Sequence, residues 1–498
     1  TFYNLAKDIS SGFNEPQTLT FGSGSTTTIS NNLTLTGASG AELSLVSSAS
    51  GKAWNISVGG TAALSYLAVS DSNNTGATLT PANSTDGGGN TNWNLNAPDT
   101  PANLGPEDYT DGSYGTDTTP TLTFDLSDPD AGTTVGYQIQ IDNDSDFSSP
   151  VVDYTSGLDA QGSFSFTVGQ DTGSGSYATG SSGQTLSDGT YYWRVKAIDV
   201  GNYESAYTAA NGGNAAFSVD TTGPTTPDQP SPAASPTADT TPSWSWGAST
   251  DDGAGLGSPA YTVEWSQDSD FETVTDSATT NDTTFTHTDE LADGTWYLRV
   301  KAVDDLGNES DWSDVGSVLV DATAPTKPGT PTATSPTSDS TPTVSWSASN
   351  DSDSGLADPA YTLEWSADPA FDGGADGSVT TNDTSAAPGP LSDGTWYFRV
   401  TATDNVGNTN TSDISSGIII DATSPTAPGK PTATSPTNDN TPAVSWSASN
   451  DSGVGLKDPA YTLEWSDDPA FDGGADGSVT TNDTTASPGS ALADGIWY

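Results

Sequence analysis

The sequence predicts an all-β protein, in which tandem β-sandwich domains follow a different β region at the N-terminus. Two observations support this class. Tryptophans recur at a step of 100 residues, as Trp246, Trp346 and Trp446 show. Within each repeat, apolar and polar residues alternate with the period of two that half-buried strands have.

The repeats set the domain organisation, because self-similarity at a fixed period indicates repeated structural units. A second series, Trp265, Trp365 and Trp465, keeps the same step. Proline-rich phrases such as VDATAPTKP join the repeats, and proline both ends a ladder and stiffens a linker. We expect an N-terminal region and four sandwiches, the first diverged and the last incomplete, over 1–97, 98–224, 225–325, 326–425 and 426–498.

Strand patterns within a repeat are regular. In the segment TWYLRVKAV, Trp296, Leu298 and Val300 share one face, whereas Arg299 and Lys301 lie on the other. Asp-Gly, Gly-Asn and Pro turns bound such segments. About seven short strands in 100 residues are typical of a β-sandwich.

These residues resemble the fibronectin type III-like and Ig-like repeats of bacterial secreted proteins. The matching features are Trp346 in the second strand, the Tyr-x-Leu-x-Trp pattern at 361–365, and the aromatic-x-hydrophobic-x-Val-x-Ala pattern of the sixth strand. The resemblance covers about four-fifths of the chain. It implies a sandwich fold, and that fold hosts many functions.

Both ends of the chain depart from the repeat. Residues 1–95 contain short strands such as LTLTG between Gly, Ser and Asn turns, and look like the last coils of a right-handed parallel β-helix or another β domain. The fourth repeat stops inside its sixth strand at Tyr498. Either further repeats follow in a longer protein, or a neighbouring chain donates the missing strands.

Composition excludes several classes of function. The chain has 65 acidic and 10 basic residues, a net charge of −55, which would repel nucleic acids and anionic membranes. It has no cysteine and no apolar run long enough to insert into a membrane. Asp outnumbers Glu about fivefold, and Asp suits turns and hard-cation sites.

Catalytic patterns are weak. The single histidine, His287, alternates with Phe285, which predicts an exposed strand face and no partner for general-base chemistry. No Gly-x-Ser-x-Gly motif is present. Aspartates recur at the same place in each repeat, and an active site does not usually come in four copies. We therefore expect a protein that is not an enzyme.

The recurring acidic and amide residues form three sets. They are Asp251, Asp351 and Asp451 after the second strand; Asp199 with Asn202, Asp304 with Asn308, and Asp404 with Asn408 after the sixth; and Asp220, Asp321 and Asp421 in the joints. In a seven-strand sandwich the first two sets lie at the pole where the chain enters. We therefore expect Asp220 to meet Asp251 and Asp304, Asp321 to meet Asp351 and Asp404, and Asp421 to meet Asp451.

Such clusters have two interpretations. Calcium takes six to eight oxygen ligands from Asp, Asn, backbone carbonyls and water, and would relieve the repulsion between the carboxylates. The resembled bacterial adhesin repeats stiffen their joints in this way. Alternatively, the residues are ordinary turn formers copied with the repeat. The preference for Asp over Ser and Asn favours calcium, and all twelve residues are candidate ligands.

Aromatic residues offer a weaker signal. Trp246, Trp265 and Trp296 have the inward parity of core residues. Tyr297 points outward beside Arg299, which favours a cation–π brace over a glycan-stacking site.

We expect an extracellular structural protein of a microbial cell surface: a surface-layer subunit, a filament or an adhesin stalk. It would assemble with copies of itself or with other surface proteins, and glycans are further candidate partners. The alternative is a spacer or carbohydrate-binding region of a large secreted polysaccharide-acting enzyme.

Overall fold

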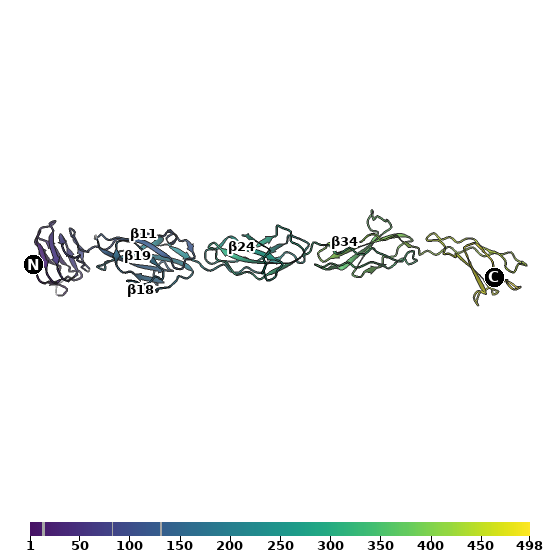
Figure 1. The fold of residues 1–498 in the computed structure, drawn as a ribbon, viewed down its shortest axis with the longest axis horizontal. Coiled ribbons are helices and arrows are strands. Elements are labelled where there is room, and N and C mark those ends of the chain that lie inside the picture. Colours follow the sequence, from purple (N-terminus) through teal and green to yellow (C-terminus); the bar gives the residue numbers. More distant parts are fainter. Residues whose placement is uncertain (12–14, 82, 130–131) are drawn as a thin grey trace.

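The computed structural model describes residues 1–11, 15–81, 83–129 and 132–498. Its units follow one another along one long axis, with the two termini at opposite ends (Figure 1). Regular structure in these residues consists of strands and two short 3₁₀ helices, η1 (Glu107–Tyr109) and η2 (Ala210–Gly213). The predicted all-β class is confirmed. Among the described residues no helix is long and apolar enough to cross a membrane.

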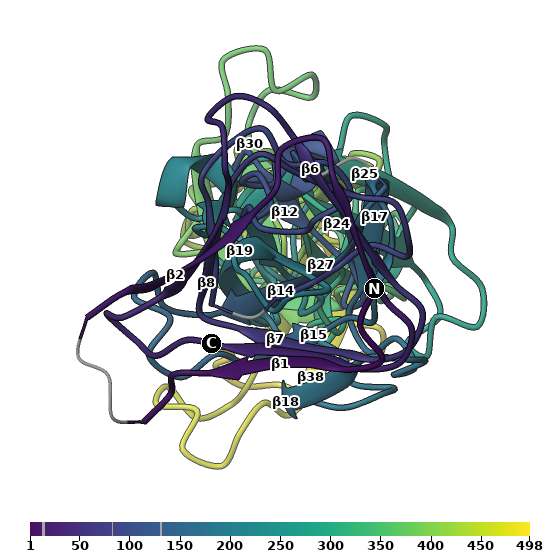
Figure 2. The ribbon, with the colours of Figure 1, turned by 90° about the vertical axis from the view of Figure 1, so that its left-hand side faces the viewer.

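The N-terminal unit is built from three parallel sheets, with strand orders β1-β4-β7, β10-β8-β5-β2 and β3-β6-β9. Consecutive strands enter different sheets, and each pairs in parallel with a strand of the next turn of the chain. Viewed along the long axis, these strands enclose a three-sided section (Figure 2). The strands are β1 (Leu5–Asp8), β2 (Gln17–Phe21), β3 (Thr26–Ile29), β4 (Leu33–Thr36), β5 (Leu43–Ser47), β6 (Trp54–Val58), β7 (Ala62–Ser65), β8 (Leu67–Val69), β9 (Ser72–Asn74) and β10 (Thr85–Asp86).

The interior of this unit is a column of apolar side chains. Parallel register places Leu45 beside Val69, and both are fully buried. Phe21 stacks on Trp54 with ring centroids 3.8 Å apart, and so packs against this column while remaining only partly buried.

The first sandwich packs the sheet β11-β13-β17 against a larger sheet of order β12-β21-β19-β14-β15-β18, to which β16 and β20 also pair. Its strands are β11 (Ala102–Gly105), β12 (Tyr114–Gly115), β13 (Thr121–Leu126), β14 (Thr134–Asp142), β15 (Val152–Thr155), β16 (Asp159–Ala160), β17 (Gly162–Thr167), β18 (Ser176–Thr179), β19 (Gly189–Asp199), β20 (Thr208–Ala209) and β21 (Phe217–Val219).

The later sandwiches repeat a simpler plan. In the second, the sheet β22-β23-β26 faces β25-β24-β27-β28, and in the third, β29-β32 faces β31-β30-β33-β34, with β35 also paired to β33. Two two-stranded sheets, β36-β39 and β37-β38, form the fourth. The bounds in the second are β22 (Ser231–Pro232), β23 (Ser243–Ser245), β24 (Leu256–Ser266), β25 (Asp276–Thr280), β26 (Thr284–Thr286), β27 (Gly294–Asp304) and β28 (Gly316–Val320). Those of the third and fourth are β29 (Val344–Ser345), β30 (Leu356–Ser366), β31 (Gly377–Thr381), β32 (Ser385–Ala386), β33 (Gly394–Asp404), β34 (Thr409–Thr411), β35 (Ile418–Ile420), β36 (Val444–Ser445), β37 (Tyr461–Trp465), β38 (Gly477–Thr481) and β39 (Thr485–Ala486).

Burial follows the period of two along β27. Trp296, Leu298 and Val300 are buried in the core between the sheets, and Arg299 and Lys301 are half-buried on the outer face. The long strand β27 ends at Asp304. Because β28 runs antiparallel to it, Asp321, the residue after β28, lies at the opposite pole. At each joint, the end of the last strand of one sandwich therefore meets the opposite pole of the next sandwich.

The arginines on the outer faces make cation–π contacts, but not with the tyrosine that the sequence suggested. The guanidinium of Arg299 lies 4.3 Å from the rings of both Phe271 and Trp312, and also pairs with Glu264 across the strands. Tyr297 is not one of these two rings. Arg399 keeps one ring, Phe371, at 4.5 Å.

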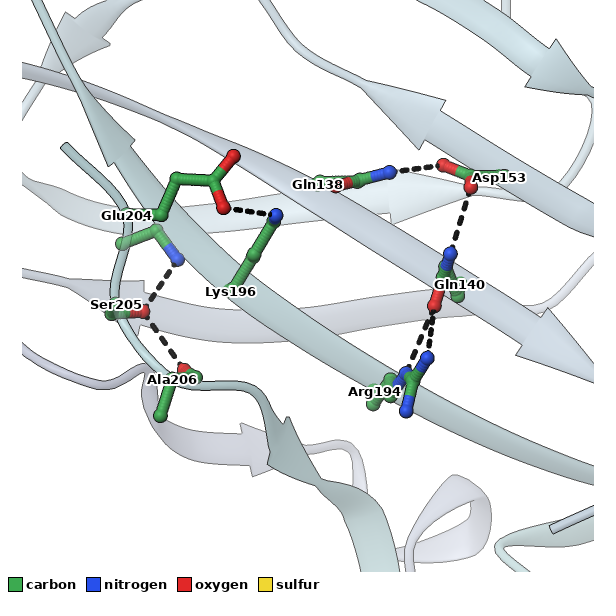
Figure 3. A network of polar contacts seen from close by, with 9 residues as sticks. Gln138, Gln140, Asp153, Arg194, Lys196, Glu204, Ser205 and Ala206 are labelled. Carbon is green, nitrogen blue, oxygen red and sulfur yellow. Dashed lines mark hydrogen bonds and ion pairs between the residues drawn. The ribbon is translucent and has the colours of Figure 1, made fainter. Parts of the chain in front are cut away.

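The first sandwich has the same kind of outer face (Figure 3). Arg194 donates to Gln140 on the neighbouring strand, and the amide of Gln140 donates to Asp153 at 2.7 Å. Lys196 pairs with Glu204 beside this network. Long basic side chains therefore cover the sheet face and hold its strands together.

Candidate metal centre

The first joint brings together three aspartates from two consecutive sandwiches. Asp220 follows β21 at the end of the first sandwich. Asp251 lies in the loop between β23 and β24 of the second sandwich, and Asp304 ends β27. Oxygens of the three carboxylates all lie within 4.8 Å of one another. Beside them is a cleft of about 460 Å³, which Asp188 and Asp252 also line.

The second joint repeats the arrangement. Asp321, Asp351 and Asp404 place their carboxylate oxygens within 4.8 Å of one another, and Asp321 is fully buried. Each cluster therefore combines one residue that ends a sandwich with two residues from the pole of the next.

Local hydrogen bonds hold each loop aspartate in place. Asp251 accepts the backbone N–H groups of Gly253 and Gly255 at 3.0 and 2.7 Å. Asp351 accepts those of Asp353 and Gly355 at 3.2 and 2.7 Å. Such turns are the usual use of Asp in loops, so the turn interpretation of these residues is compatible with their geometry.

The asparagines turn their amide nitrogen, and not the oxygen expected of a metal ligand, towards the joint. The amide nitrogen of Asn308 donates to the carboxylate of Asp304 at 2.7 Å and to the carbonyl oxygen of Asp220 at 3.2 Å. Asn408 makes the same two bonds, to Asp404 and to the carbonyl oxygen of Asp321. Since both partners are acceptors, the amide must present its N–H₂ group, and its oxygen points elsewhere.

The joint aspartates lie against the loop backbone of the next sandwich. Asp220 accepts the N–H of Ala254 at 2.7 Å. A Cβ on Gly253 would lie 2.1 Å from an oxygen of Asp220, so the carboxylate of Asp220 approaches the loop backbone closely at this position. In the second joint the corresponding residue is Asp353.

At the third joint, the two expected residues, Asp421 and Asp451, contact the same loop of the fourth sandwich. Asp421 accepts the N–H of Val454 at 2.8 Å, and Asp451 accepts that of Gly453 in the same loop. The other oxygen of Asp421 is enclosed and makes no hydrogen bond with the described residues. A buried carboxylate oxygen without a partner is costly, so this atom has unfilled bonding capacity.

Asp199 and Asn202 belong to a joint of another kind. Neither is in the carboxylate clusters that the described residues form. Asp199 accepts the N–H of Tyr203, and the phenol of Tyr203 lies 3.0 Å from the carbonyl oxygens of Pro81 and Ser84. A tyrosine, rather than a carboxylate cluster, therefore ties the N-terminal unit to the first sandwich.

Sequence reasoning missed one cluster. Asp293, Asp321 and Asp353 also lie within 4.8 Å of one another, so Asp321 is shared by two groups at the second joint. One signal was available: Asp353 replaces the glycine found at 253 and 453, and Asp293 belongs to a recurring Asp-Gly pair before the sixth strand.

The donor set of the clusters fits a hard cation. Three like charges within 4.8 Å repel one another, and buried carboxylates need a counter-charge. The ion pairs found among the described residues lie elsewhere, at Lys196–Glu204, Arg299–Glu264, Lys301–Glu309, Lys327–Asp413 and Arg399–Glu364. Clustered carboxylate oxygens suit hard cations such as calcium and magnesium better than metals that prefer thiolate or imidazole ligands.

No protein-family description matches this chain, and no curated protein is similar to it in sequence. Among solved structures 364 chains match, including the fibronectin type III domains FN1–FN3 of chicken CNTN1. That match has 14% sequence identity and a TM-score of 0.27, and covers 65% of this chain and 99% of the other. A TM-score of this size supports no conclusion about activity or partners.

Proposed function

We propose that the chain is a non-enzymatic structural protein of a microbial cell surface, a rod whose joints bind calcium. The observation that carries this proposal is the carboxylate cluster built from two consecutive sandwiches at each of two joints. A bound cation neutralises the clustered charge and makes separation of the two sandwiches costly. The joint then keeps one angle, and the number of repeats sets the length of the rod.

Further features agree with an extracellular rod. The N-terminal unit, with its three parallel sheets, fits the end of a right-handed parallel β-helix on which the sandwiches are mounted. A net charge of −55 keeps separate rods apart until divalent cations bridge them. Self-assembly with copies of the chain, in a surface layer, a filament or a stalk, would then depend on the calcium concentration.

Calorimetry of the full chain tests the proposed joints. Calcium is titrated into chelator-treated protein, and small-angle scattering records the maximum dimension in calcium and in chelator. We expect binding in the micromolar to millimolar range together with a longer, stiffer particle in calcium. If no heat of binding is detected and the scattering does not change, the aspartates act only as turn formers and the proposed calcium joints are wrong.

A matched pair of variants shows whether calcium binds at the joint residues. Asp321→Asn removes a charge from the second joint and should abolish binding there while the first joint still binds. Asp339→Asn removes an exposed charge from a turn of the third sandwich, where Asp339 accepts the N–H of Thr341, and should leave binding unchanged. Equal loss in both variants would indicate binding by net charge alone.

The alternative function is a spacer or carbohydrate-binding region of a large secreted enzyme. One observation favours its carbohydrate-binding part: a cavity with aromatic walls in the second sandwich. Calcium-independent scattering combined with glycan binding would support this alternative over the calcium-stiffened rod.

A further inference from the structure

The second sandwich contains a cavity that the joints do not use. It has a volume of about 410 Å³ and is lined by residues of β25 and β26. These are edge strands of the two facing sheets, so the cavity opens at the side of the sandwich. Pockets that bind small molecules hold roughly 300–1,000 Å³. None of the lining residues belongs to the carboxylate clusters.

Three rings form one wall of this cavity. The ring of Trp265 lies 5.2 Å from that of Phe285 and 4.9 Å from that of His287, measured between centroids. Phe285 and His287 meet edge to face at 5.1 Å. Trp265 and Phe285 are only partly buried, so the wall offers an apolar surface to a ligand.

His287 offers this cavity a hydrogen-bond donor. The side chain is only 4% exposed, which corrects the expectation of an exposed strand face. Burial lowers the pKa of His287 to about 4, so the imidazole is neutral near pH 7. Nε2 accepts the indole N–H of Trp244 at 3.2 Å, which leaves the proton on Nδ1. Nδ1 makes no hydrogen bond with the described residues, and the imidazole lines the cavity.

The rim of the cavity carries acceptors. Asp276, Asp289 and Glu290 line it and are exposed. A ligand that fills the cavity would therefore meet an apolar wall, one N–H donor at its base and carboxylates at its mouth.

We propose that this cavity binds a neutral pyranose unit of a glycan. One face of a pyranose ring is made of C–H groups and packs on Trp265, a ring or hydroxyl oxygen accepts from His287, and other hydroxyls donate to the carboxylates. A simple quaternary ammonium ion such as tetramethylammonium would suit the carboxylates but has no acceptor for the N–H of His287. An acidic sugar would be repelled by the rim.

The third sandwich is a natural comparison. It keeps a tryptophan at the corresponding position, Trp365, and strand pairing aligns Phe285 with Ala386. Pro388 stands where the second sandwich has His287. The third sandwich therefore lacks two of the three rings of the proposed site, and the site does not depend on the calcium joints.

The full chain is tested in chelator, which separates this site from the joints. It is titrated with methyl glycosides of neutral hexoses and applied to immobilised neutral oligosaccharides. At least one neutral sugar should bind, and Trp265→Ala should weaken its affinity at least tenfold. Trp365→Ala should leave the affinity unchanged. Binding of the free glycosides indicates a single sugar unit as ligand, and binding of immobilised oligosaccharides alone indicates an extended glycan.

A second variant tests the proposal in case Trp265→Ala does not fold. Glu290→Lys changes an exposed rim residue, so the fold should persist, as circular dichroism would show, and affinity should fall at least threefold. The proposal is overturned if no neutral sugar binds in either format. Wild-type affinity in both folded variants, or binding of tetramethylammonium in place of sugars, would overturn it as well.

Discussion

The side-chain amide of Asn408 donates to the carbonyl oxygen of Asp321, 3.0 Å away, and so links the third sandwich to the residue that follows β28, the last strand of the second. The same amide donates to the carboxylate of Asp404 at 2.8 Å. Asn308 makes the equivalent link one joint earlier. Both joints therefore have a direct hydrogen bond between sandwiches beside the carboxylate cluster.

Asn408→Ala should destabilise the third sandwich, because two acceptors near a buried joint lose their donor. The expected cost is about 1–2 kcal/mol. For a domain of this size, about 1 kcal/mol lowers the melting temperature by roughly 4–8 °C, which calorimetry can detect. Asn438→Ala, at an exposed position of the fourth sandwich, is the control. Equal effects of the two variants would contradict the role of the joint amide.

Asp353→Gly should weaken cation binding at the second joint and leave the fold intact. Glycine is the natural residue at the corresponding positions 253 and 453, so the backbone tolerates it. The variant removes the cluster of Asp293, Asp321 and Asp353 and keeps that of Asp321, Asp351 and Asp404. We expect up to about tenfold lower calcium affinity, or about 1.4 kcal/mol. An unchanged calorimetric titration would show that Asp353 takes no part.

The stability of the second sandwich should fall as the pH is lowered from about 6.5 towards 4. Burial lowers the pKa of His287 from 6.5 to about 4, so the unfolded chain binds this proton first. The stabilisation is complete above pH 6.5, and the loss reaches about 2 kcal/mol at pH 5. The rim carboxylates Asp276, Asp289 and Glu290 oppose the effect by favouring the charged imidazole.

Melting temperatures between pH 7 and 5 measure this dependence, because most exposed carboxylates stay ionised in that window. His287→Gln has no titrating group and should show a flatter profile. A profile identical to that of the wild type would refute the assignment to His287.

Tyr203→Phe should loosen the N-terminal unit from the first sandwich, whether or not calcium is present. The backbone N–H of Ser84 donates to the phenol oxygen, which also lies 3.0 Å from the carbonyl oxygen of Pro81. Loss of these bonds should cost about 1–2 kcal/mol. Hydrogen exchange at the amide of Ser84 should become faster in this variant. Tyr207→Phe, on a ring that stacks on Arg194, should leave that exchange rate unchanged.

Much of the architecture was predictable from local patterns. Alternation along β27 predicts which of Trp296, Leu298 and Arg299 face the core, because successive side chains of a strand point to opposite faces. Repetition at 100 residues places the aspartates at the same pole of each sandwich. Strand parity then puts Asp321 near Asp351 and Asp404, as the structure does.

The details of the site were less predictable. Asn408 was expected to offer oxygen, but the acceptors around it select its nitrogen. His287 was expected at the surface, but Trp244 and Trp265 enclose it. Asp404 is only 4 residues from Asn408, but Asp321 is 87 residues from it, and Trp244 is 43 residues from His287.

By itself, the sequence determined the all-β class, the repeat and the position of each aspartate in its loop, since these follow from backbone periodicity and turn chemistry within a few residues. Only the tertiary structure decided that Asp293 and Asp353 lie beside Asp321. It also decided that Tyr203, rather than a carboxylate cluster, connects the N-terminal unit to the first sandwich, and that two edge strands enclose an aromatic cavity. The reason is physical: contacts across sheets and between domains depend on how distant surfaces pack, and local periodicity does not specify that packing.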